Sequence, residues 1–170
     1  MPLQVQAMDR ESIRSNFRPS KTKILFVGES PPANGAFFYV CSPMTGYMAK
    51  VFAQVLGKQF QSLNDFLSFF MAVGCYMDDL SYAPVDDLPR PERRKAVDGC
   101  VAALAGRMKE HQPEYVIAVL KSIEAPVRRA AHIANLQVPV HAVPFPGQGN
   151  QRRFVAELSE ILKPIYAPVA

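Results

Sequence analysis

The sequence predicts an α/β domain, a three-layer α/β/α sandwich with a mostly parallel four-stranded sheet. Two observations lead to this prediction. Four short apolar runs are typical of strands buried on both faces, and amphipathic segments with helical spacing lie between them. The expected order is strand, helix, helix, strand, helix, strand, helix, strand, helix, as in parallel strands joined by helical crossovers. With 170 residues, 49% of them hydrophobic, the chain can bury one core.

The first strand is the apolar run at residues 24–27, which leads into a loop at residues 28–35. Two prolines stiffen this loop, and two glycines let its backbone approach a ligand closely. In open α/β sheets, ligands bind beyond the carboxyl ends of the strands. We therefore expect the chemistry of this protein to begin at this loop.

Two amphipathic helices follow. The spacing of apolar residues predicts a helix over residues 44–56, closed by Gly57. A second helix covers residues 63–73, with Ser62 expected to cap its first turn.

The second strand, residues 75–81, carries two aspartates where a buried strand would keep apolar residues. Adjacent strand residues point to opposite faces, so at most one of Asp78 and Asp79 can face a given site. After a loop rich in proline and arginine, the pattern predicts one long helix from about Pro91 to His111.

The last third of the chain predicts two further strands, at residues 115–120 and 138–143. Between them, Ser122 is expected to cap a helix. The loop at residues 144–150 then leads to a final helix, capped by Asn150.

For the domain organisation, we expect residues 1–20 to form an N-terminal extension with a short helix at 9–17. Residues 21–163 would form the domain and residues 164–170 a tail. The N-terminus lacks an apolar signal core, and no window approaches the roughly 20 apolar residues of a membrane span. We therefore expect a cytoplasmic monomer that does not contact a membrane.

Composition narrows the choice of cofactors and partners. Cys41, Cys75 and Cys100 are widely spaced and form no C-x-x-C motif, which argues against a disulfide framework and against a zinc site. We expect no metal and no cofactor. The net charge of +4 is compatible with a polyanionic partner but does not by itself indicate one.

Four motifs in succession resemble those of one family. The loop Gly28-Glu29-Ser30-Pro31-Pro32 resembles a post-strand loop written Gly-Gln-Asp-Pro-Tyr or Gly-Glu-Ala-Pro-Gly in that family. The segment Gly35-Ala36-Phe37-Phe38 resembles the family's Gly-x-x-Phe, whose phenylalanine stacks on an extruded base.

The third motif comprises Tyr76 to Leu80, the proline and arginine loop, Cys100 and the strand Pro113 to Leu120. The fourth, Val143-Pro144-Phe145-Pro146, falls where the family has His-Pro-Ser-Pro. From about Lys23 to Leu162, the chain thus resembles the uracil-DNA glycosylase superfamily.

This resemblance implies a protein that takes a damaged or deaminated base out of DNA and hydrolyses its N-glycosidic bond. Phe38, or Phe37, would stack on the base, and Asp79 would read its edge. The catalytic candidates are Glu29, Ser30, Asp79 and His141. The base-binding candidates are Gly28, Pro31, Phe37, Phe38, Asp78 and Asp79. The candidates for gripping DNA phosphates are Lys121, Ser122, Gln148, Gly149, Asn150, Arg152 and Arg153.

The chain departs from the family at three positions. Ser30 stands where one branch has the aspartate that orients water, and the neighbouring Glu29 is expected to face elsewhere. Val143 replaces the histidine donor, which His141 could supply only in a different register. Asp79 replaces an asparagine, and an ionised aspartate only accepts hydrogen bonds, which predicts an altered base choice or no excision.

The iron-sulfur cluster of one branch needs four cysteine thiolates. Only Cys100 falls at a matching position, and Ala83 replaces another of the four. We expect no iron-sulfur cluster.

Other interpretations stay open. Phe37 and Phe38 could be core residues, His141 a structural histidine and loop 144–150 a plain turn. Asp78 or Asp79 could pair with a loop arginine such as Arg90. The chain could also be a non-catalytic nucleotide or nucleic-acid binding module. A serine hydrolase with Ser30 and His141 is a further alternative, although no Gly-x-Ser-x-Gly motif is present.

Overall fold

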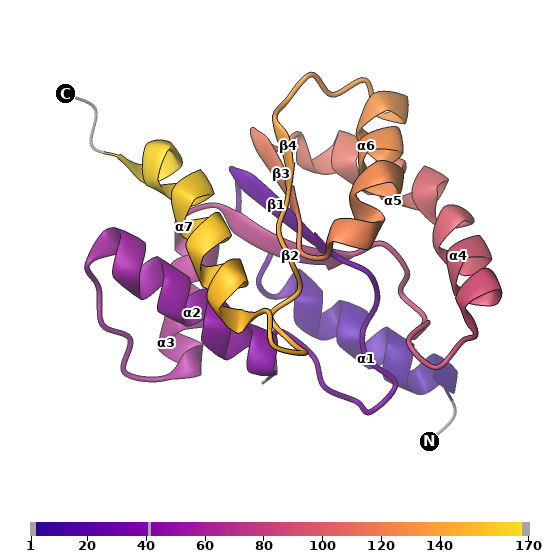
Figure 1. Ribbon diagram of the computed structural model, residues 1–170, viewed down its shortest axis with the longest axis horizontal. Coiled ribbons are helices and arrows are strands. Elements are labelled where there is room, and N and C mark those ends of the chain that lie inside the picture. Colours follow the sequence, from indigo (N-terminus) through magenta and orange to yellow (C-terminus); the bar gives the residue numbers. More distant parts are fainter. Residues whose placement is uncertain (1–2, 41, 168–170) are drawn as a thin grey trace.

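The protein has an α/β fold with a four-stranded, all-parallel sheet flanked by helices (Figure 1). The computed structural model describes residues 3–40 and 42–167, so Cys41 lies outside the described residues. The strand order is β2-β1-β3-β4. The strands are β1 (Ile24–Gly28), β2 (Cys75–Asp79), β3 (Tyr115–Ala118) and β4 (Val140–Ala142).

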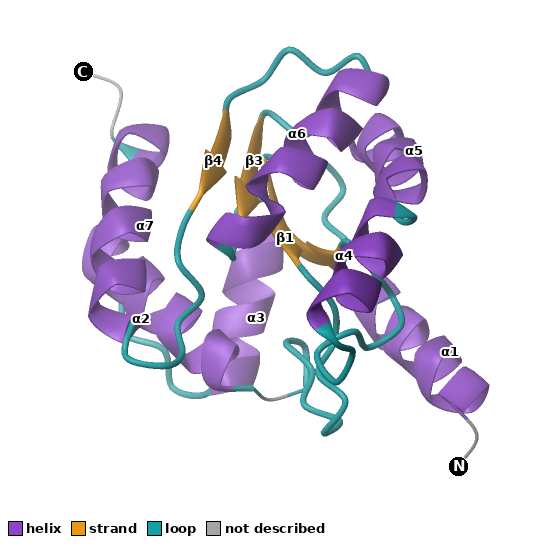
Figure 2. Cartoon of the chain, turned by 45° about the vertical axis from the view of Figure 1, so that its right-hand side comes forward, coloured by secondary structure: helices purple, strands orange, loops and turns teal. Residues whose placement is uncertain are grey.

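Helices cover both faces of this sheet (Figure 2). On one face lie α2 (Pro43–Leu56), α3 (Leu63–Ala72) and α7 (Gln151–Tyr166), with α2 packed on both α3 and α7. On the other lie α4 (Arg90–Asp98), α5 (Val101–His111) and α6 (Glu124–Ile133), where α5 packs on α6. A 3-10 turn, η1 (Lys121–Ile123), precedes α6. None of the described helices combines the length and the apolar character that crossing a membrane requires.

Strand β1 occupies the centre of the fold because its side chains tolerate burial on both faces. All five of its residues are buried, and it pairs in parallel with β2 on one side and β3 on the other. The run predicted from the sequence is therefore confirmed as a central parallel strand. Pairing continues past the end of β2, because Leu80 and Ser81 donate backbone hydrogen bonds to Gly28 and Glu29.

The predicted long helix to His111 is wrong, because the structure has two helices there. Helix α4 ends at Asp98, and the N–H of Gly99 closes its last turn by donating to Lys95 O. Helix α5 begins at Val101, after Cys100. Glycine is a poor helix former, so the chain can turn at this point at little cost.

Two predicted helix caps are also wrong in detail. Ser122 lies inside η1, and no side chain caps α6. Asn150 stands at the N-cap of α7, but its backbone oxygen, not its side chain, accepts the hydrogen bond from Phe154 N–H. By contrast, Ser62 caps α3 as predicted, accepting from Asp65 N–H at 3.1 Å.

The N-terminal helix α1 (Leu3–Ser15) extends further toward the N-terminus than the predicted helix at 9–17. It lies beside β2, and its Arg14 donates a hydrogen bond to the backbone oxygen of Met77 at 3.1 Å. Arg14 is among the largest fully buried side chains of the described chain. The segment expected to be an extension therefore packs against the edge of the sheet.

His111, at the end of α5, makes the stability of the fold depend on pH. Its Nδ1 lies 3.1 Å from Thr22 Oγ1, and its ring lies 4.8 Å from that of Tyr76. Burial lowers the pKa of His111 below its ordinary value of 6.5. In the unfolded chain His111 takes up its proton near pH 6.5, whereas the folded protein binds it only at lower pH. This contribution to stability is therefore present above about pH 6.5 and is lost as the pH falls through the lower pKa of the folded state.

We expect His111→Gln to remove this loss of unfolding free energy at mildly acidic pH. The wild type and the variant should therefore differ more in how their stability changes with pH than in their stability at neutral pH. Urea denaturation across mildly acidic pH measures the effect. The control is His132→Gln, since His132 is exposed on α6. Parallel curves for the wild type and His111→Gln would contradict the prediction.

Candidate functional site

A cleft of about 950 Å³ opens at the carboxyl ends of the strands. Its walls come from the loops after β1, β3 and β4, from the end of β2 and from the first turns of α2 and α7. The predicted site residues that line it are Gly28, Glu29, Ser30, Pro31, Phe37, Phe38, Asp79, Lys121, Ser122, Gln148, Asn150 and Arg153. Asp78, His141, Gly149 and Arg152 lie outside this lining.

The two polar side chains after β1 both bind the segment that follows β2. Ser30 Oγ accepts a hydrogen bond from Val85 N–H at 3.2 Å. Glu29 accepts from Arg93 Nε at 2.9 Å and forms an ion pair with the same guanidinium. Glu29 lines the cleft, although the sequence indicated that it would face elsewhere. These contacts hold the two loops together at one wall of the cleft.

The carboxylate of Asp79 lies over Gly28 at the edge of the cleft. A Cβ atom on residue 28 would come within 2.6 Å of Asp79 Oδ1, so only glycine fits beneath this carboxylate. Asp79 is 8% exposed, and its Oδ2 accepts from Arg14 Nη2 at 3.0 Å. Burial raises the pKa of Asp79 above its ordinary value, and the charge of Arg14 opposes this rise.

Asp78 points to the opposite side of β2 and is fully buried. Its Oδ2 accepts from Arg107 Nε at 2.7 Å, and its Oδ1 lies 3.5 Å from Arg14 Nη1. The suggested partner Arg90 takes no part in these ion pairs. Asp78 therefore links β2 to Arg107 and Arg14 inside the fold. It does not reach the base-binding position predicted for it, because the alternation of side chains along the strand turns it away from the cleft.

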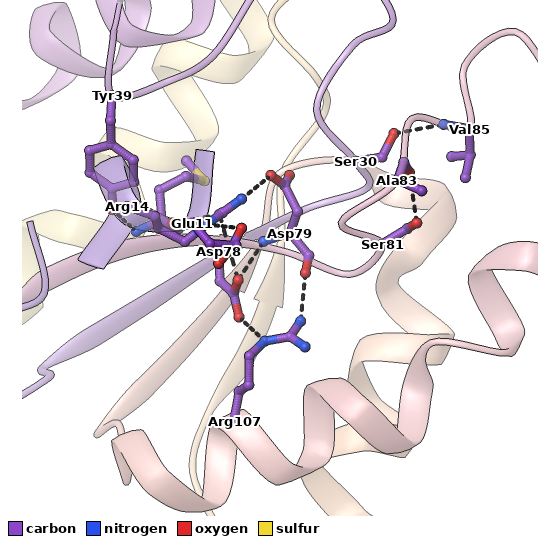
Figure 3. A network of polar contacts seen from close by, with 11 residues as sticks. Glu11, Arg14, Ser30, Tyr39, Asp78, Asp79, Ser81, Ala83, Val85 and Arg107 are labelled. Atoms are coloured by element: carbon purple, nitrogen blue, oxygen red, sulfur yellow. Dashed lines mark hydrogen bonds and ion pairs between the residues drawn. The ribbon is translucent and has the colours of Figure 1, made fainter. Parts of the chain in front are cut away.

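The residue that sequence reasoning missed is Arg14 (Figure 3). Its side chain is 1% exposed and, besides the two aspartates, forms an ion pair with Glu11 at 3.2 Å. Its guanidinium lies 5.2 Å from the ring centre of Phe37 and 4.9 Å from that of Tyr82. The only signal in the sequence was the adjacent pair of aspartates in a strand, because buried carboxylates require cationic partners.

Two aromatic residues of the cleft, Phe37 and Phe38, also belong to the core. Phe37 and Phe38 are 5% and 7% exposed and still line the cleft. Phe38 packs on Phe70 and on Tyr39, with ring centres 5.4 and 5.1 Å apart. Tyr39 in turn accepts a hydrogen bond from Met77 N–H through its hydroxyl, at 2.6 Å. Phe37 and Phe38 thus belong to the core and also line the cleft, and their stacking role stays a prediction.

The structure does not bring Ser30 and His141 together. His141 sits in β4, where it pairs with Ile117, and it does not line the cleft. The hydroxyl of Ser30 is engaged by Val85. Val143, which the resemblance aligned with a histidine, is fully buried and offers no polar side chain. The hydrolase alternative therefore lacks the contact between nucleophile and base that it needs.

A basic rim lies on the side of α7. Lys121 Nζ donates to Ala142 O at 2.7 Å and pairs with Glu157 at 2.9 Å. Arg153 pairs with the same carboxylate at 3.2 Å. The hydrogen bond from Lys121 lowers the pKa of Glu157 below its ordinary value. One carboxylate thus serves two cations, which leaves a net positive charge beside the first turn of α7.

The loop before α7 presents an aromatic side chain to solvent. Phe145 is 46% exposed and lines the cleft. A Cβ atom on residue 147 would lie 2.9 Å from the Phe145 ring, so Gly147 lets the ring fold back on the loop. Gln148 and Gly149 have φ angles of 52° and 86°, which give the turn its left-handed course into α7. Among the described residues, no cluster of three or more His, Cys, Asp or Glu side chains could hold a metal ion.

We expect Arg14→Met to destabilise the protein by about 3–5 kcal/mol, because it leaves two buried carboxylates without their shared cation. Urea denaturation at neutral pH measures this. Arg18→Met is the matched control: Arg18 is 46% exposed, pairs with Glu110 at 3.9 Å, and should cost only about 0–1 kcal/mol. Similar losses in the two variants would show that Arg14 is not a buried anchor.

Comparison with known proteins identifies no family or relative for this chain. A scan against protein-family models finds no match to the chain, and a search of curated proteins finds none either. The resemblance of the four motifs to the uracil-DNA glycosylase superfamily therefore remains an expectation.

Proposed function

We propose that this chain is a DNA glycosylase-like protein of the uracil-DNA glycosylase superfamily, which takes a damaged or deaminated base into the cleft and hydrolyses its N-glycosidic bond. One observation carries the proposal. Segments far apart in the sequence bring an aromatic wall, a buried carboxylate and a basic rim to a single cleft at the carboxyl ends of the strands. The segments that line it include parts of all four motifs on which the resemblance rests.

The cleft suits a flat ring that has left a base stack. A base extruded from DNA needs stacking partners on its faces and hydrogen bonds at its edge. The rings of Phe37 and Phe38 offer apolar surface, and the carboxylate of Asp79 offers a polar contact nearby. The volume of about 950 Å³ falls within the ordinary range for small-molecule sites and exceeds what one base would fill. The remaining space would take the attached sugar and phosphates.

The rim suits the rest of the nucleotide strand. Arg153 and the N-terminal turn of α7 favour a phosphate group. The exposed ring of Phe145 can press against bases beside the extruded one, as apolar wedges do in DNA-bending proteins. Together they would hold the strand while the target base occupies the cleft.

The chemistry would use negative charge near the sugar. As the glycosidic bond breaks, its electron pair leaves with the base and the sugar becomes an oxocarbenium-like cation. Glu29 lines the cleft and can stabilise this cation, while Asp79 contacts the edge of the base. Water then adds its oxygen to the sugar carbon, and its proton compensates the charge of the departing base.

A specific observation favours a second candidate, the non-catalytic nucleotide or nucleic-acid binding module. Ser30 and Glu29, the polar residues after β1, are both engaged in internal contacts, with Val85 N–H and with Arg93. Val143 supplies no hydrogen-bond donor. Such a module would keep the aromatic wall and the basic rim but would leave the glycosidic bond intact.

Strand-cleavage assays test the proposal on duplexes that carry one uracil, hypoxanthine, xanthine or alkylated base. We expect an abasic product from at least one of them. Salt-sensitive binding without any product would favour the binding module, and the absence of both would overturn both candidates.

We further expect Gly28→Ala to lower excision by about 100-fold, because the added methyl group would displace the Asp79 carboxylate. Gly46→Ala is the matched control. A Cβ atom on residue 46 meets no atom within 4 Å, and alanine at this exposed position of α2 should raise stability by about 1 kcal/mol without changing activity. Equal excision by both variants would remove Asp79 from the proposed site.

Phe145→Ala should weaken binding to single-stranded DNA by roughly 10-fold, the lower end of what one stacked base contributes. Fluorescence anisotropy with a labelled oligonucleotide measures it. Ile133→Ala removes a comparably exposed apolar side chain from α6 and should leave binding unchanged. Unchanged binding in Phe145→Ala would mean that the loop does not contact DNA.

A further inference from the structure

We propose that Arg14 fixes Asp79 as a hydrogen-bond acceptor facing the cleft, so that the cleft selects bases whose edge carries an amino group over bases whose edge carries a carbonyl. This inference rests on the proposed function and deepens it, since it names the class of base. It also gives α1, which sequence reasoning left without a function, a defined part in the site.

The partners of Arg14 fix its orientation. Its guanidinium is held by Glu11 at Nε, by Met77 O and Asp78 at Nη1, and by Asp79 at Nη2. With acceptors on all three nitrogens and a side chain that is 1% exposed, the group has one orientation available. Arginine carries donors only and keeps its charge. Arg14 therefore always presents a donor to Asp79.

The two carboxylate oxygens of Asp79 differ in their contacts. Oδ2 accepts the hydrogen bond from Arg14 at 3.0 Å (Figure 3). Oδ1 lies over Gly28, which itself lines the cleft. Within residues 3–40 and 42–167, Oδ1 accepts no hydrogen bond from another side chain or from the backbone. The oxygen at the cleft is thus an acceptor that awaits a donor.

This oxygen discriminates between the groups that a base can present at its edge. An amino group donates a hydrogen bond to such an oxygen, whereas a carbonyl group in the same place sets one acceptor against another. A site that leaves a buried charged acceptor unpaired rejects the wrong ligand. Because the rings of Phe37 and Phe38 limit how the base can lie, its edge cannot simply turn away.

The experiment compares bases that carry an amino group in one member of each pair and a carbonyl group in the other. The adjacent ring nitrogen changes with it, from an acceptor in the amino base to an N–H donor in the carbonyl base. Single-stranded oligonucleotides carry one cytosine or uracil, and one adenine or hypoxanthine, within a run of abasic spacers. We expect the amino member of each pair to bind more tightly to the full chain by about 10-fold to 100-fold. The same pairs in duplexes, with oxidised or alkylated derivatives, give the excision rates.

Asp79→Asn supplies the sharpest test. Arg14 only donates, so the amide oxygen must take the place of Oδ2 and the amide nitrogen that of Oδ1. The cleft then presents a donor, and the preference should invert toward uracil and hypoxanthine. Asp87→Asn is the matched control, since Asp87 lies in the loop that follows β2, is exposed and does not line the cleft.

Arg14 is tested as a positioning residue. Arg14→Lys keeps a cationic donor and should keep the preference for amino bases, whereas Arg14→Met should abolish the preference. If Arg14→Met does not fold, Asp79→Asn decides alone, because it leaves the charge and donors of Arg14 in place.

The outcomes separate this inference from the proposed function. Preference for amino bases that inverts in Asp79→Asn supports the inference, even if no base is excised. Excision or binding that favours carbonyl bases, or an unchanged preference in Asp79→Asn, overturns the inference and leaves the proposed function standing. Neither excision nor base-dependent binding overturns both.

Discussion

The fold depends on the ion cluster at the end of β2. A parallel strand buried on both faces ends there in two aspartates, and isolated carboxylates in such a place would cost several kcal/mol each. Arg14 approaches from α1, and Arg107 approaches from α5, where it also donates to Asp79 O at 2.7 Å. Tyr82 lies between them, with guanidinium carbons 4.9 and 4.3 Å from its ring centre. If either helix left the sheet, the buried aspartates would lose a cationic partner.

The sequence predicted the parts of the fold that local pattern controls. The apolar run of β1 and the apolar stripes of α2 and α3 can be recognised in the sequence because packing in a sheet, or against it, imposes their spacing. The break at Gly99 escaped prediction because the apolar stripe continues across it from Val97 to Val101. Ion-pair partners escaped for a different reason. Arg14 and Asp79 are 65 residues apart, and only the docking of α1 beside β2 decides that Arg14, rather than a nearer loop arginine, pairs with them.

The candidate site was predictable in place but not in detail. Strand order and parallel direction bring the loops after β1, β3 and β4 to one edge of the sheet, so the convergence of these segments follows from topology. What each side chain does there depends on contacts that topology leaves open. Ser30 accepts a hydrogen bond from Val85, and Glu29 accepts one from Arg93. His141 lies within β4, where it pairs with β3, and so does not reach the cleft.

Gly28, Asp79 and Arg14 depend on one another through space. Aspartate at position 79 can lie over the chain only because residue 28 is glycine, and its burial beside Asp78 is tolerable only because Arg14 is present. Gly28, Asp79 and Arg14 therefore form one unit, so that a substitution at any one of them would alter the contacts of the others. Since Arg14 also stabilises the docking of α1, the group that orients the cleft oxygen is the same group that holds the helix. A substitution of Arg14 would thus cost stability, whereas Asp79→Asn keeps the buried cation. If the proposed function holds, position 79 is therefore where we expect a substitution to change the choice of base.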